Sequence, residues 1–457
     1  MTKPNGWQKG VALFLLCAAT AIVASAQTFT SLFSFDGTNG FWPDRISLVQ
    51  GANGELYGTT YYGGGPDDTG LGTIFKITEA GTLTTLYAFD NTDNGEPDGP
   101  LVLATDGNFY GTTFEGGANG GYGTVFQITP NGTVTTLHSF AGTDGSLPLG
   151  GLIQASNGAF YGTTELGGAS NLGTVYKITP DGELTTLHSF DGIDGTQSWA
   201  GLTQATNGNL YGTARSGGTD GVGTLFRITL EGTFETLFNF GGSDGANPSG
   251  GLVQGADGNL YGTTDAGTFF RMTLGGTLTT LCTCIGGTPV AGVIRGTDGN
   301  FYGTTIDGGA NGDGTVFEIT TDGTITTLHT FDGTDGSLVY GGLVQATSGI
   351  FYGTTEHGGA NVCAASGCGT VYSLSTGLGP FVAFVHSSGK VGRTGGILGQ
   401  GFTGTTAVSL NAISASFTVV SDTFIRATVP EGATTGYVTV TTPTGVLTSN
   451  VPFHVIP

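Results

Sequence analysis

The sequence predicts an all-β protein built from a β-propeller and a second, smaller β domain. Three observations support this fold class: 87 of the 457 residues are Gly, one string of residues recurs seven times, and residues 378–457 lack that string. Gly weakens helix interiors and favours tight turns, so many corners and few helices are expected. With 15 Pro and no Gly at every third position, collagen is excluded. A hydrophobic content of 37% argues against disorder.

The chain is strongly acidic, with 34 Asp and Glu against 12 Lys and Arg and a net charge of −22. Proteins that bind nucleic acid present a basic surface to the phosphates, so the composition excludes nucleic acid as a partner. An acidic surface favours solubility and attracts cations, but it does not specify a fold.

The first 26 residues differ from the rest of the chain. Lys3 and Lys9 precede an apolar run over 11–24, which ends in the small-x-small pattern at which signal peptides are cleaved. We therefore predict a cleaved signal peptide over 1–26. The run is shorter than the roughly 20 residues of a membrane span, and no later segment is apolar enough to cross a bilayer. We expect a secreted or cell-surface protein with no membrane span after signal removal.

The recurring string is Tyr-Gly-Thr preceded by Leu or Phe, with Tyr at 57, 110, 161, 211, 261, 302 and 352. Around it, each unit of 41 to 53 residues contains four short runs of β-branched and aromatic residues, separated by Gly, Asn and Asp turns. In the third unit these runs are 152–155, 159–164, 173–179 and 184–190. The dipeptides Asn157-Gly158 and Asp181-Gly182 supply the positive φ that tight hairpins need.

Four antiparallel strands in a unit of about 50 residues are typical of a propeller blade. Bulky residues occur at both parities, as expected of a sheet packed on both faces; an open β-solenoid is the alternative, although its coils are usually shorter. Residues 29–37 match a fourth strand and its exit turn, while the seventh unit stops after its third strand at 369–374. Joined, they leave no open edge. We predict a closed seven-bladed propeller over 27–377.

The fifth unit departs from its siblings, and the cysteines are distributed unevenly. The connection between its second and third strands is only 266–267, which predicts a notch in the rim. Cys282 and Cys284 stand in the places of His and Phe, where they could form a tight bridge or stay unpaired. Cys363 and Cys368 flank an extended loop of the seventh unit, and a disulfide is expected there in an exported protein. Zinc would need both pairs together, but they lie in different blades.

Residues 378–457 form a different domain, nearly neutral in charge and with strong Val/Thr alternation. The strings at 395–402, 421–430 and 435–440, with a final strand at 453–456, resemble an IPT/TIG domain, an immunoglobulin-like β-sandwich. The segment lacks paired Cys, so it is not the disulfide-linked type. The resemblance implies a spacer or binding module outside the cell. Scarce basic residues argue against the DNA-binding role of some intracellular relatives.

The strings Asp/Asn-Gly-Asn-Leu/Phe-Tyr-Gly-Thr-Thr and Gly-Thr-Val-Phe-x-Ile-Thr resemble the GloVer tandem repeat of bacterial secreted proteins over residues 28–376. This resemblance implies export, with relatives that carry assorted C-terminal anchoring or adhesive modules. It brings no agreed activity and therefore assigns no catalytic residue. More loosely, the Asp-Gly-Asn-Leu-Tyr strand is similar to strands of propellers such as streptogramin lyases.

The positions after Tyr-Gly-Thr-Thr vary most among the units. They hold Tyr61, Phe114, Glu165, Arg215, Asp265, Ile306 and Glu356, with His357 after the last of these. Because each occupies the same place in its blade, they are expected to form a ring on one rim, where loops hold ligands and strands hold shape. A ring of aromatic, acidic and basic residues could grip a sugar or a peptide. Drift of surface residues without a role is the alternative.

Other candidates for chemistry have structural explanations. One strand position holds His138, His188, His329, Tyr87, Phe238 and Cys282 in different units, which indicates packing. Asp191 with Asp194, and Asp332 with Asp335, place two carboxylates three residues apart before Gly, which is a weak pattern for calcium. Turn formation alone also explains these residues. No other metal or cofactor is indicated.

These observations predict an exported, non-catalytic binding or adhesion protein, expected to be a monomer, that holds a carbohydrate or protein on its rim. The rival is an extracellular hydrolase or lyase, which would need three of the residues Arg45, Arg215, Arg295, Glu356 and His357 to converge at one mouth of the channel. A cell-surface spacer without a ligand is the third alternative. Fold does not assign function, so the ligand, the mode of surface retention and the oligomeric state stay open.

Overall fold

The computed structural model describes residues 27–65, 70–90, 95–363 and 366–456. These residues form 38 strands and no helix, so no described helix is long and apolar enough to span a membrane. The predicted signal peptide, residues 1–26, lies outside the described residues.

Seven four-stranded antiparallel sheets follow one another along the described residues before 376, and we number them 1 to 7 in chain order. Their first strands are β2 (Val49–Gln50), β6 (Val102–Leu103), β10 (Ile153–Gln154), β14 (Thr203–Gln204), β18 (Val253–Gln254), β22 (Ile294–Arg295) and β26 (Val344–Gln345). Their second strands are β3 (Leu56–Thr60), β7 (Phe109–Thr113), β11 (Phe160–Thr164), β15 (Leu210–Ala214), β19 (Leu260–Thr263), β23 (Phe301–Thr305) and β27 (Phe351–Thr355). Their third strands are β4 (Thr73–Ile77), β8 (Thr124–Ile128), β12 (Thr174–Ile178), β16 (Thr224–Ile228), β20 (Thr268–Met272), β24 (Thr315–Ile319) and β28 (Thr370–Ser375). Their fourth strands are β5 (Leu83–Ala88), β9 (Val134–Ser139), β13 (Leu184–Ser189), β17 (Phe234–Asn239), β21 (Leu278–Thr283), β25 (Ile325–Thr330) and, in sheet 7, β1 (Thr28–Ser34).

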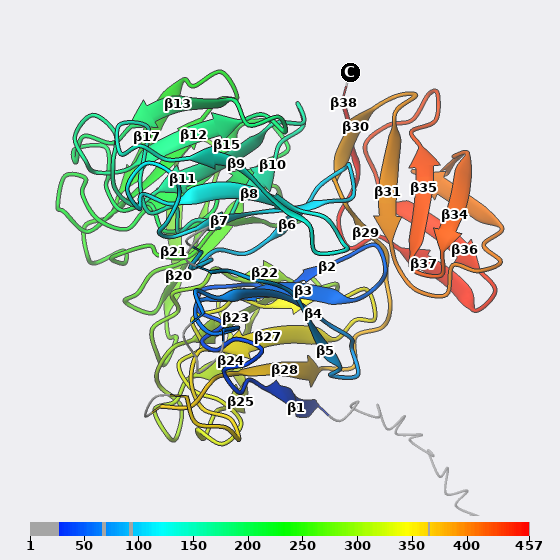
Figure 1. Cartoon of the computed structure of the whole chain (residues 1–457). Helices are drawn as coiled ribbons and strands as arrows, with labels where there is room; N and C mark the ends of the chain where they lie inside the picture. The colour runs from blue at the N-terminus through cyan, green and yellow to red at the C-terminus, as the bar shows by residue number, and fades with distance from the viewer. Residues whose placement is uncertain (1–26, 66–69, 91–94, 364–365, 457) are drawn as a thin grey trace, which may run out of the picture.

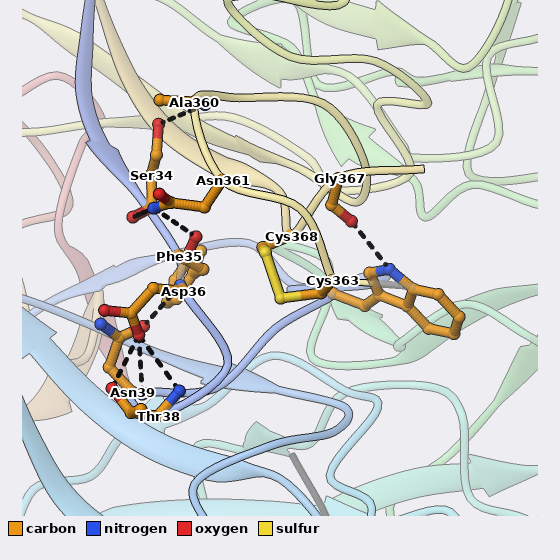
Figure 2. Close-up of a disulfide and its surroundings, with 11 residues drawn as sticks. Ser34, Phe35, Asp36, Thr38, Asn39, Ala360, Asn361, Cys363, Gly367 and Cys368 are labelled. Atoms are coloured by element: carbon orange, nitrogen blue, oxygen red, sulfur yellow. Dashed lines mark hydrogen bonds between the residues drawn. A yellow bond between two sulfur atoms is a disulfide. The ribbon is translucent and has the colours of Figure 1, made fainter. Parts of the chain in front are cut away.

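Sheet 7 combines the two ends of the repeat region. Strand β1 pairs antiparallel with β28 from Thr28 opposite Ser375 to Ser34 opposite Thr370, and the two strands lie side by side in Figure 1. Beyond β1, Asn361 Nδ2 donates to the carbonyl of Phe35 at 2.9 Å (Figure 2). Residues 344–375 supply only three strands of sheet 7. The fourth strand is β1, the first described strand of the chain.

Neighbouring sheets are joined by a repeated hydrogen bond. The Gln that ends a first strand accepts from a backbone N–H of the preceding sheet, as in Ser156 to Gln204 at 2.9 Å. The same bond runs from Thr347 of sheet 7 to Gln50 of sheet 1 at 2.9 Å. Hydrophobic clusters likewise combine adjacent sheets, including sheets 7 and 1. Four-stranded antiparallel sheets packed face to face in this way are the blades of a β-propeller.

The second strand of each sheet is buried along its whole length, as five of five residues are in β15. Both faces of such a strand pack against neighbouring sheets, which explains bulky residues at both parities. Its central Gly is needed for close packing, because a Cβ on Gly212 would lie 2.4 Å from the ring of Phe226.

In the hairpin dipeptides only the glycine adopts positive φ, at +84° for Gly158 and +95° for Gly182. The Asn has another function, since Asn157 Oδ1 accepts from the N–H of Ala159 at 3.1 Å. This side-chain bond reproduces a backbone turn, so the Asn and the Gly act by different physical means.

Sheet 5 has the short connection that the sequence predicts, closed by a bond from the N–H of Gly267 to the carbonyl of Thr264 at 2.9 Å. The prediction that Cys284 occupies the Phe position is wrong. Ile285 is buried there and donates its N–H to Gly267, as Phe190 does to Gly173 in sheet 3. One extra residue after β21 leaves Cys284 exposed instead.

The C-terminal residues form two four-stranded sheets and a short parallel pair. One sheet has the order β29 (Ala383–Phe384), β31 (Thr394–Leu398), β35 (Phe424–Thr428) and β34 (Phe417–Ser421). The other has the order β33 (Ile413–Ser414), β32 (Ala407–Leu410), β36 (Val438–Thr442) and β37 (Gly445–Thr448), and β30 (Ser388–Lys390) pairs with β38 (His454–Ile456). Residues of both sheets, such as Ile425 and Val440, share one core, so this part is a β-sandwich.

The sandwich packs on one side of the propeller, beside β2 and β6 in Figure 1. Leu398 and Phe424 join the core around Tyr57, and Thr423 Oγ1 donates to the carbonyl of Ala52 at 2.8 Å. Ala52 lies in the hairpin that precedes the second strand of sheet 1. The sandwich therefore covers the hairpin end of this strand and leaves the opposite end, where Tyr61 follows, uncovered.

Candidate functional site

A cavity of about 400 Å³ opens at that opposite end, and we call it the mouth cavity. Its aromatic lining consists of Trp42, Tyr61, Tyr62, Phe114 and Trp199. Its charged lining consists of Asp44, Asp98, Glu165 and Glu356 together with Arg45, and Leu149 completes it. Small-molecule sites are typically cavities of about 300–1,000 Å³ with apolar walls and a few placed polar groups.

The seven variable residues after the second strands do occupy equivalent places. Each donates its N–H to a carbonyl of the loop that enters the same sheet, namely Tyr61 to Trp42, Phe114 to Glu96, Glu165 to Leu147, Arg215 to Gln197, Asp265 to Asn247, Ile306 to Thr288 and Glu356 to Leu338, at 2.8 to 3.1 Å. Tyr61, Phe114, Glu165 and Glu356 line the mouth cavity. Arg215 and Asp265 pair with each other at 3.1 Å, and Ile306 is outside the lining.

Six of the seven carbonyls that receive these bonds belong to strained residues, and Thr288 is the exception. Positive φ occurs at Trp42, Glu96, Leu147, Gln197, Asn247 and Leu338, between 52° and 63°. Such a conformation is uncommon for residues other than Gly and clusters at ligand and active sites. Two residues further on, the incoming loops place Asp44, Asp98, Leu149 and Trp199 on the mouth cavity.

These loop residues form a second ring that the sequence analysis missed. A signal was present, because the same position holds Asp44, Asp98, Leu149, Trp199, Ser249, Val290 and Tyr340 between otherwise similar neighbours. Variation at this position is as large as at the position after Tyr-Gly-Thr-Thr. Comparison of the units at every position, rather than around the strongest string, would have found it.

Trp199 carries two cations from the propeller itself. The guanidinium carbons of Arg45 and Arg215 lie 4.6 Å and 4.1 Å from its ring centroid.

A second cavity of about 270 Å³ adjoins the mouth cavity and is lined largely by the first strands and the Gly residues before them. Arg45, Leu149 and Trp199 line both cavities and so separate them.

Burial controls the acid–base behaviour of the mouth carboxylates. Asp98 is only 4% exposed, and this burial raises its pKa well above the usual range, assisted by Asp44 and opposed by Arg45. Burial and the nearby Asp44 raise the pKa of Glu356 to about 8. Burial also raises the pKa of Asp44. The cavity therefore holds several carboxyl groups whose charge is costly in the absence of a cation.

Comparison with known proteins agrees with the repeat structure. The model of the Gloeobacter/Verrucomicrobia repeat matches residues 18–155, 106–284 and 264–401. The chain belongs to this family. No curated protein matches the chain.

Solved structures similar to this Gloeobacter/Verrucomicrobia repeat protein include a streptogramin B lyase, at 16% identity and a TM-score of 0.55, covering 76% of this chain and 97% of the lyase. Virginiamycin B lyase from Staphylococcus aureus, also at 16% identity and a TM-score of 0.55, covers 77% of this chain and 99% of the lyase. A catalytically inactive form of the latter with quinupristin gives the same values. At this identity the likeness shows the β-propeller fold alone.

Among the residues proposed for an enzyme, only Arg45 and Glu356 line the mouth cavity. His357 Nε2 lies 3.5 Å from Glu356 Oε1, and burial lowers the pKa of this histidine. Arg295 is remote from the mouth and donates to the carbonyl of Asn450 in the sandwich at 3.3 Å. The cavity lining therefore includes two of the five residues, fewer than the three that the enzyme alternative requires at one point.

The two Asp-Gly turns considered for calcium are held by their own aspartates. Asp191 Oδ1 accepts from the N–H of Ile193, and Asp194 Oδ1 accepts from the N–H of Asp191, both at 2.9 Å. Asp194 Oδ2 is 2.7 Å from His188 Nε2. Asp332 and Asp335 repeat this arrangement with His329, which lies 2.8 Å from Asp335. Within the described residues, no three His, Cys, Asp or Glu groups are placed to hold a metal ion.

The histidine position is thus more than a packing site. His138, His188 and His329 each pair with the Asp six residues later, at 2.7 to 2.9 Å. Units with Tyr, Phe or Cys at this position have no imidazole and so cannot form the His–Asp pair. This pair was not predicted, although the constant spacing from His to Asp was a signal in the sequence.

Two disulfides lie on the propeller. Cys363 and Cys368 are bonded across the extended loop of sheet 7, close to the start of sheet 1 (Figure 2). Gly367 in the same loop accepts from Trp42 Nε1 at 3.3 Å. Cys282 and Cys284 are bonded to each other at the edge of sheet 5. The Cys363–Cys368 bond therefore supports the loop beside a wall residue of the mouth cavity.

Proposed function

We propose that this protein is an exported, non-catalytic binding protein that holds a carbohydrate in the mouth cavity. The observation that carries the proposal is the combination of five aromatic side chains with four carboxylates around about 400 Å³. Aromatic faces pack against the C–H faces of sugars, and carboxylates accept hydrogen bonds from sugar hydroxyls. A protein ligand is the second possibility within the same binding role.

We also propose that the seven sheets are the seven blades of a propeller that β1 closes. The pairing of β1 with β28 and the hydrogen bond from Thr347 to Gln50 support this closure. The sandwich is taken as an immunoglobulin-like domain of the IPT/TIG type, supported by its two four-stranded sheets around one core. Because it covers the hairpin end, it serves as a spacer or anchor while the mouth faces outward.

A hydrolase or lyase is the alternative, favoured by one observation. Burial raises the pKa of Glu356 to about 8, which suits a general acid at neutral pH, and other carboxylates line the same cavity. Glycosidases use two carboxyl groups with separated pKa values. Product analysis of each bound oligosaccharide after long incubation distinguishes an enzyme, which cleaves it, from a binding protein, which returns it intact.

A glycan panel probed with the full chain and with Phe114→Ala tests the binding role. We expect oligosaccharides to be retained by the native chain and to lose at least roughly tenfold in affinity with the variant, since aromatic truncation removes packing worth over 1 kcal/mol. Tyr122→Ala is the matched control, because Tyr122 is 40% exposed and outside the lining. Equal losses in both variants, or no glycan retained at all, would contradict the proposal.

A further inference from the structure

The four carboxylates of the mouth cavity lack a close cationic partner. Among the described residues, their ion pairs are limited to Asp44 with Arg45 at 3.8 Å and Glu356 with His357 at 3.5 Å. Burial lowers the pKa of His357, so this ring is neutral at neutral pH. Arg45 is also shared with the ring of Trp199. The cavity's own cations therefore balance the ionised forms of these carboxyl groups poorly, so a bound cation would favour their ionisation and lower the raised pKa values of Asp98 and Glu356.

Elsewhere the chain does pair its half-buried acids closely. Asp265 Oδ2 is 3.1 Å from Arg215 Nη2, and Glu55 Oε2 is 2.8 Å from Lys76 Nζ. Charged groups removed from water are ordinarily paired in this way, because an unpaired buried charge is costly. The mouth carboxylates are the exception.

Three polar atoms on the cavity have no hydrogen-bond partner among the described residues. They are Asp44 Oδ1, Asp98 Oδ1 and Trp199 Nε1, all buried. Asp98 is only 4% exposed and lines the cavity. Buried polar groups without partners are rare and call for an explanation. Two acceptors and one donor therefore belong to residues that line the same cavity, so a ligand that reaches them must offer hydrogen-bond donors and an acceptor.

The aromatic wall is suited to a cation. Within the described residues, cation–π contacts fall on Trp199 and Tyr340, and none falls on Trp42, Tyr61 or Phe114. Proteins recognise organic cations with aromatic faces and nearby carboxylates. The aromatic wall and the unpaired carboxylates therefore both favour a ligand that carries an organic cation.

We propose that the ligand is an amino sugar whose free, protonated amine lies among the mouth carboxylates, with Asp98 its main partner. The ammonium supplies the missing charge and the donors for Asp44 and Asp98, and a sugar hydroxyl accepts from Trp199 Nε1. The sugar ring packs on the aromatic wall. This inference rests on the proposed carbohydrate binding and adds the charge of the ligand.

Calorimetric titration of the full chain near neutral pH with tri-glucosamine and with tri-N-acetylglucosamine tests the inference. The two probes share the sugar ring and differ in whether the amine is free or acetylated. We expect tri-glucosamine to bind at least roughly tenfold more tightly, equal to about 1.4 kcal/mol. Asp98→Asn should remove most of this preference. Glu183→Gln, at an exposed carboxylate of sheet 3, should leave it unchanged.

The outcomes separate the two proposals. Equal affinity for both probes would overturn the amine inference and leave carbohydrate binding intact. Binding of a lysine-rich peptide with no binding of either sugar, or no binding of any probe, would overturn both. If Asp98→Asn does not fold, as its melting curve will show, Glu165→Gln takes its place with the same expectation. If folded variants of both Asp98 and Glu165 keep the full preference for tri-glucosamine, the assignment of the amine to the mouth carboxylates is wrong.

Discussion

Strand β15, Leu210–Ala214, and the residue after it, Arg215, are neighbours in the chain but belong to different regions of the molecule. The strand is buried throughout, and its Tyr-Gly-Thr recurs in every sheet. Arg215 has a side chain that is 30% exposed, and other sheets have Tyr, Phe, Glu, Asp or Ile at its place. The strand must fit between two sheets, whereas Arg215 need only donate one backbone bond. Repetition therefore marks the fold, and departure from it marks a rim position that lines the mouth cavity in four of the seven sheets.

The largest effect should follow from removing the strand that completes sheet 7. Deletion of residues 27–37 removes β1 and Phe35, which is fully buried, and leaves β28 with an open edge. We expect the melting temperature to fall by at least about 10 °C, or the chain to fail to fold. Ser31→Ala, at an exposed residue of β1, is the control and should have little effect. An unchanged melting curve after the deletion would show that the ring is not closed by β1.

A single methyl group in a repeated strand should have the next largest effect. In Gly212→Ala the new Cβ would lie 2.4 Å from the ring of Phe226 and 2.7 Å from Leu202. Overpacking of this kind costs about 1–3 kcal/mol, measurable by chemical denaturation. Gly395→Ala is the matched control, since nothing lies within 4 Å of the added Cβ. Equal stability of the two variants would mean that the repeated Gly is not a packing requirement.

The two disulfides should differ in their effects. Replacing Cys363 and Cys368 by Ser should lower the free energy of unfolding by about 2 kcal/mol, because the bond closes a short loop between buried residues. The Cys282–Cys284 bond closes a still shorter loop at an exposed edge, so its loss should cost less. Denaturation of both double variants gives the comparison. A larger cost at Cys282–Cys284 would reverse the expected order.

A further effect should depend on pH and arise in the mouth. Burial raises the pKa of Glu356 from 4.5 to about 8, with Asp44 adding to the shift and Arg45 opposing it. Between these values the native state holds a proton that the unfolded state has lost, so this group's contribution to stability falls as pH rises from 4.5 to about 8. Asp98, Tyr340 and His357 also lie in this environment.

Glu356→Gln should remove that dependence. The variant should melt several degrees above the native chain at about pH 9, and the difference should nearly vanish at about pH 4.5. Glu183→Gln, on an exposed hairpin, should show no such trend. A difference that is constant across this range would mean that Glu356 does not titrate as its burial requires.

Much of the propeller follows from local rules. Gly-containing hairpins, β-branched strands and a fixed period determine the strands, because these depend on neighbours in the sequence. The burial of Ile285 rather than Cys284 does not follow, since it depends on which side chain fills the interior better. A Phe or Ile side chain fills that space, whereas Cys284, which is bonded to Cys282, does not.

The mouth could be predicted only in part. Positions after Tyr-Gly-Thr-Thr could be aligned, so the places of Glu165 and Glu356 were foreseeable. The incoming loops could not be placed from sequence, because their positive φ at Trp42 and Leu147 has no residue preference behind it. Those loops bring Asp98 and Trp199 onto the cavity from different sheets. Contacts between sheets set the cavity, and no local pattern encodes them.

Tryptophan fluorescence tests the central claim, that ligand binds in the mouth cavity. Trp42 and Trp199 both line it, and the third tryptophan, Trp7, belongs to the predicted signal peptide. Titration of the chain beginning at Gln27 with an oligosaccharide retained on the glycan panel should change the emission saturably, with the dissociation constant found by calorimetry. Binding measured by calorimetry without any change in tryptophan emission would contradict the account.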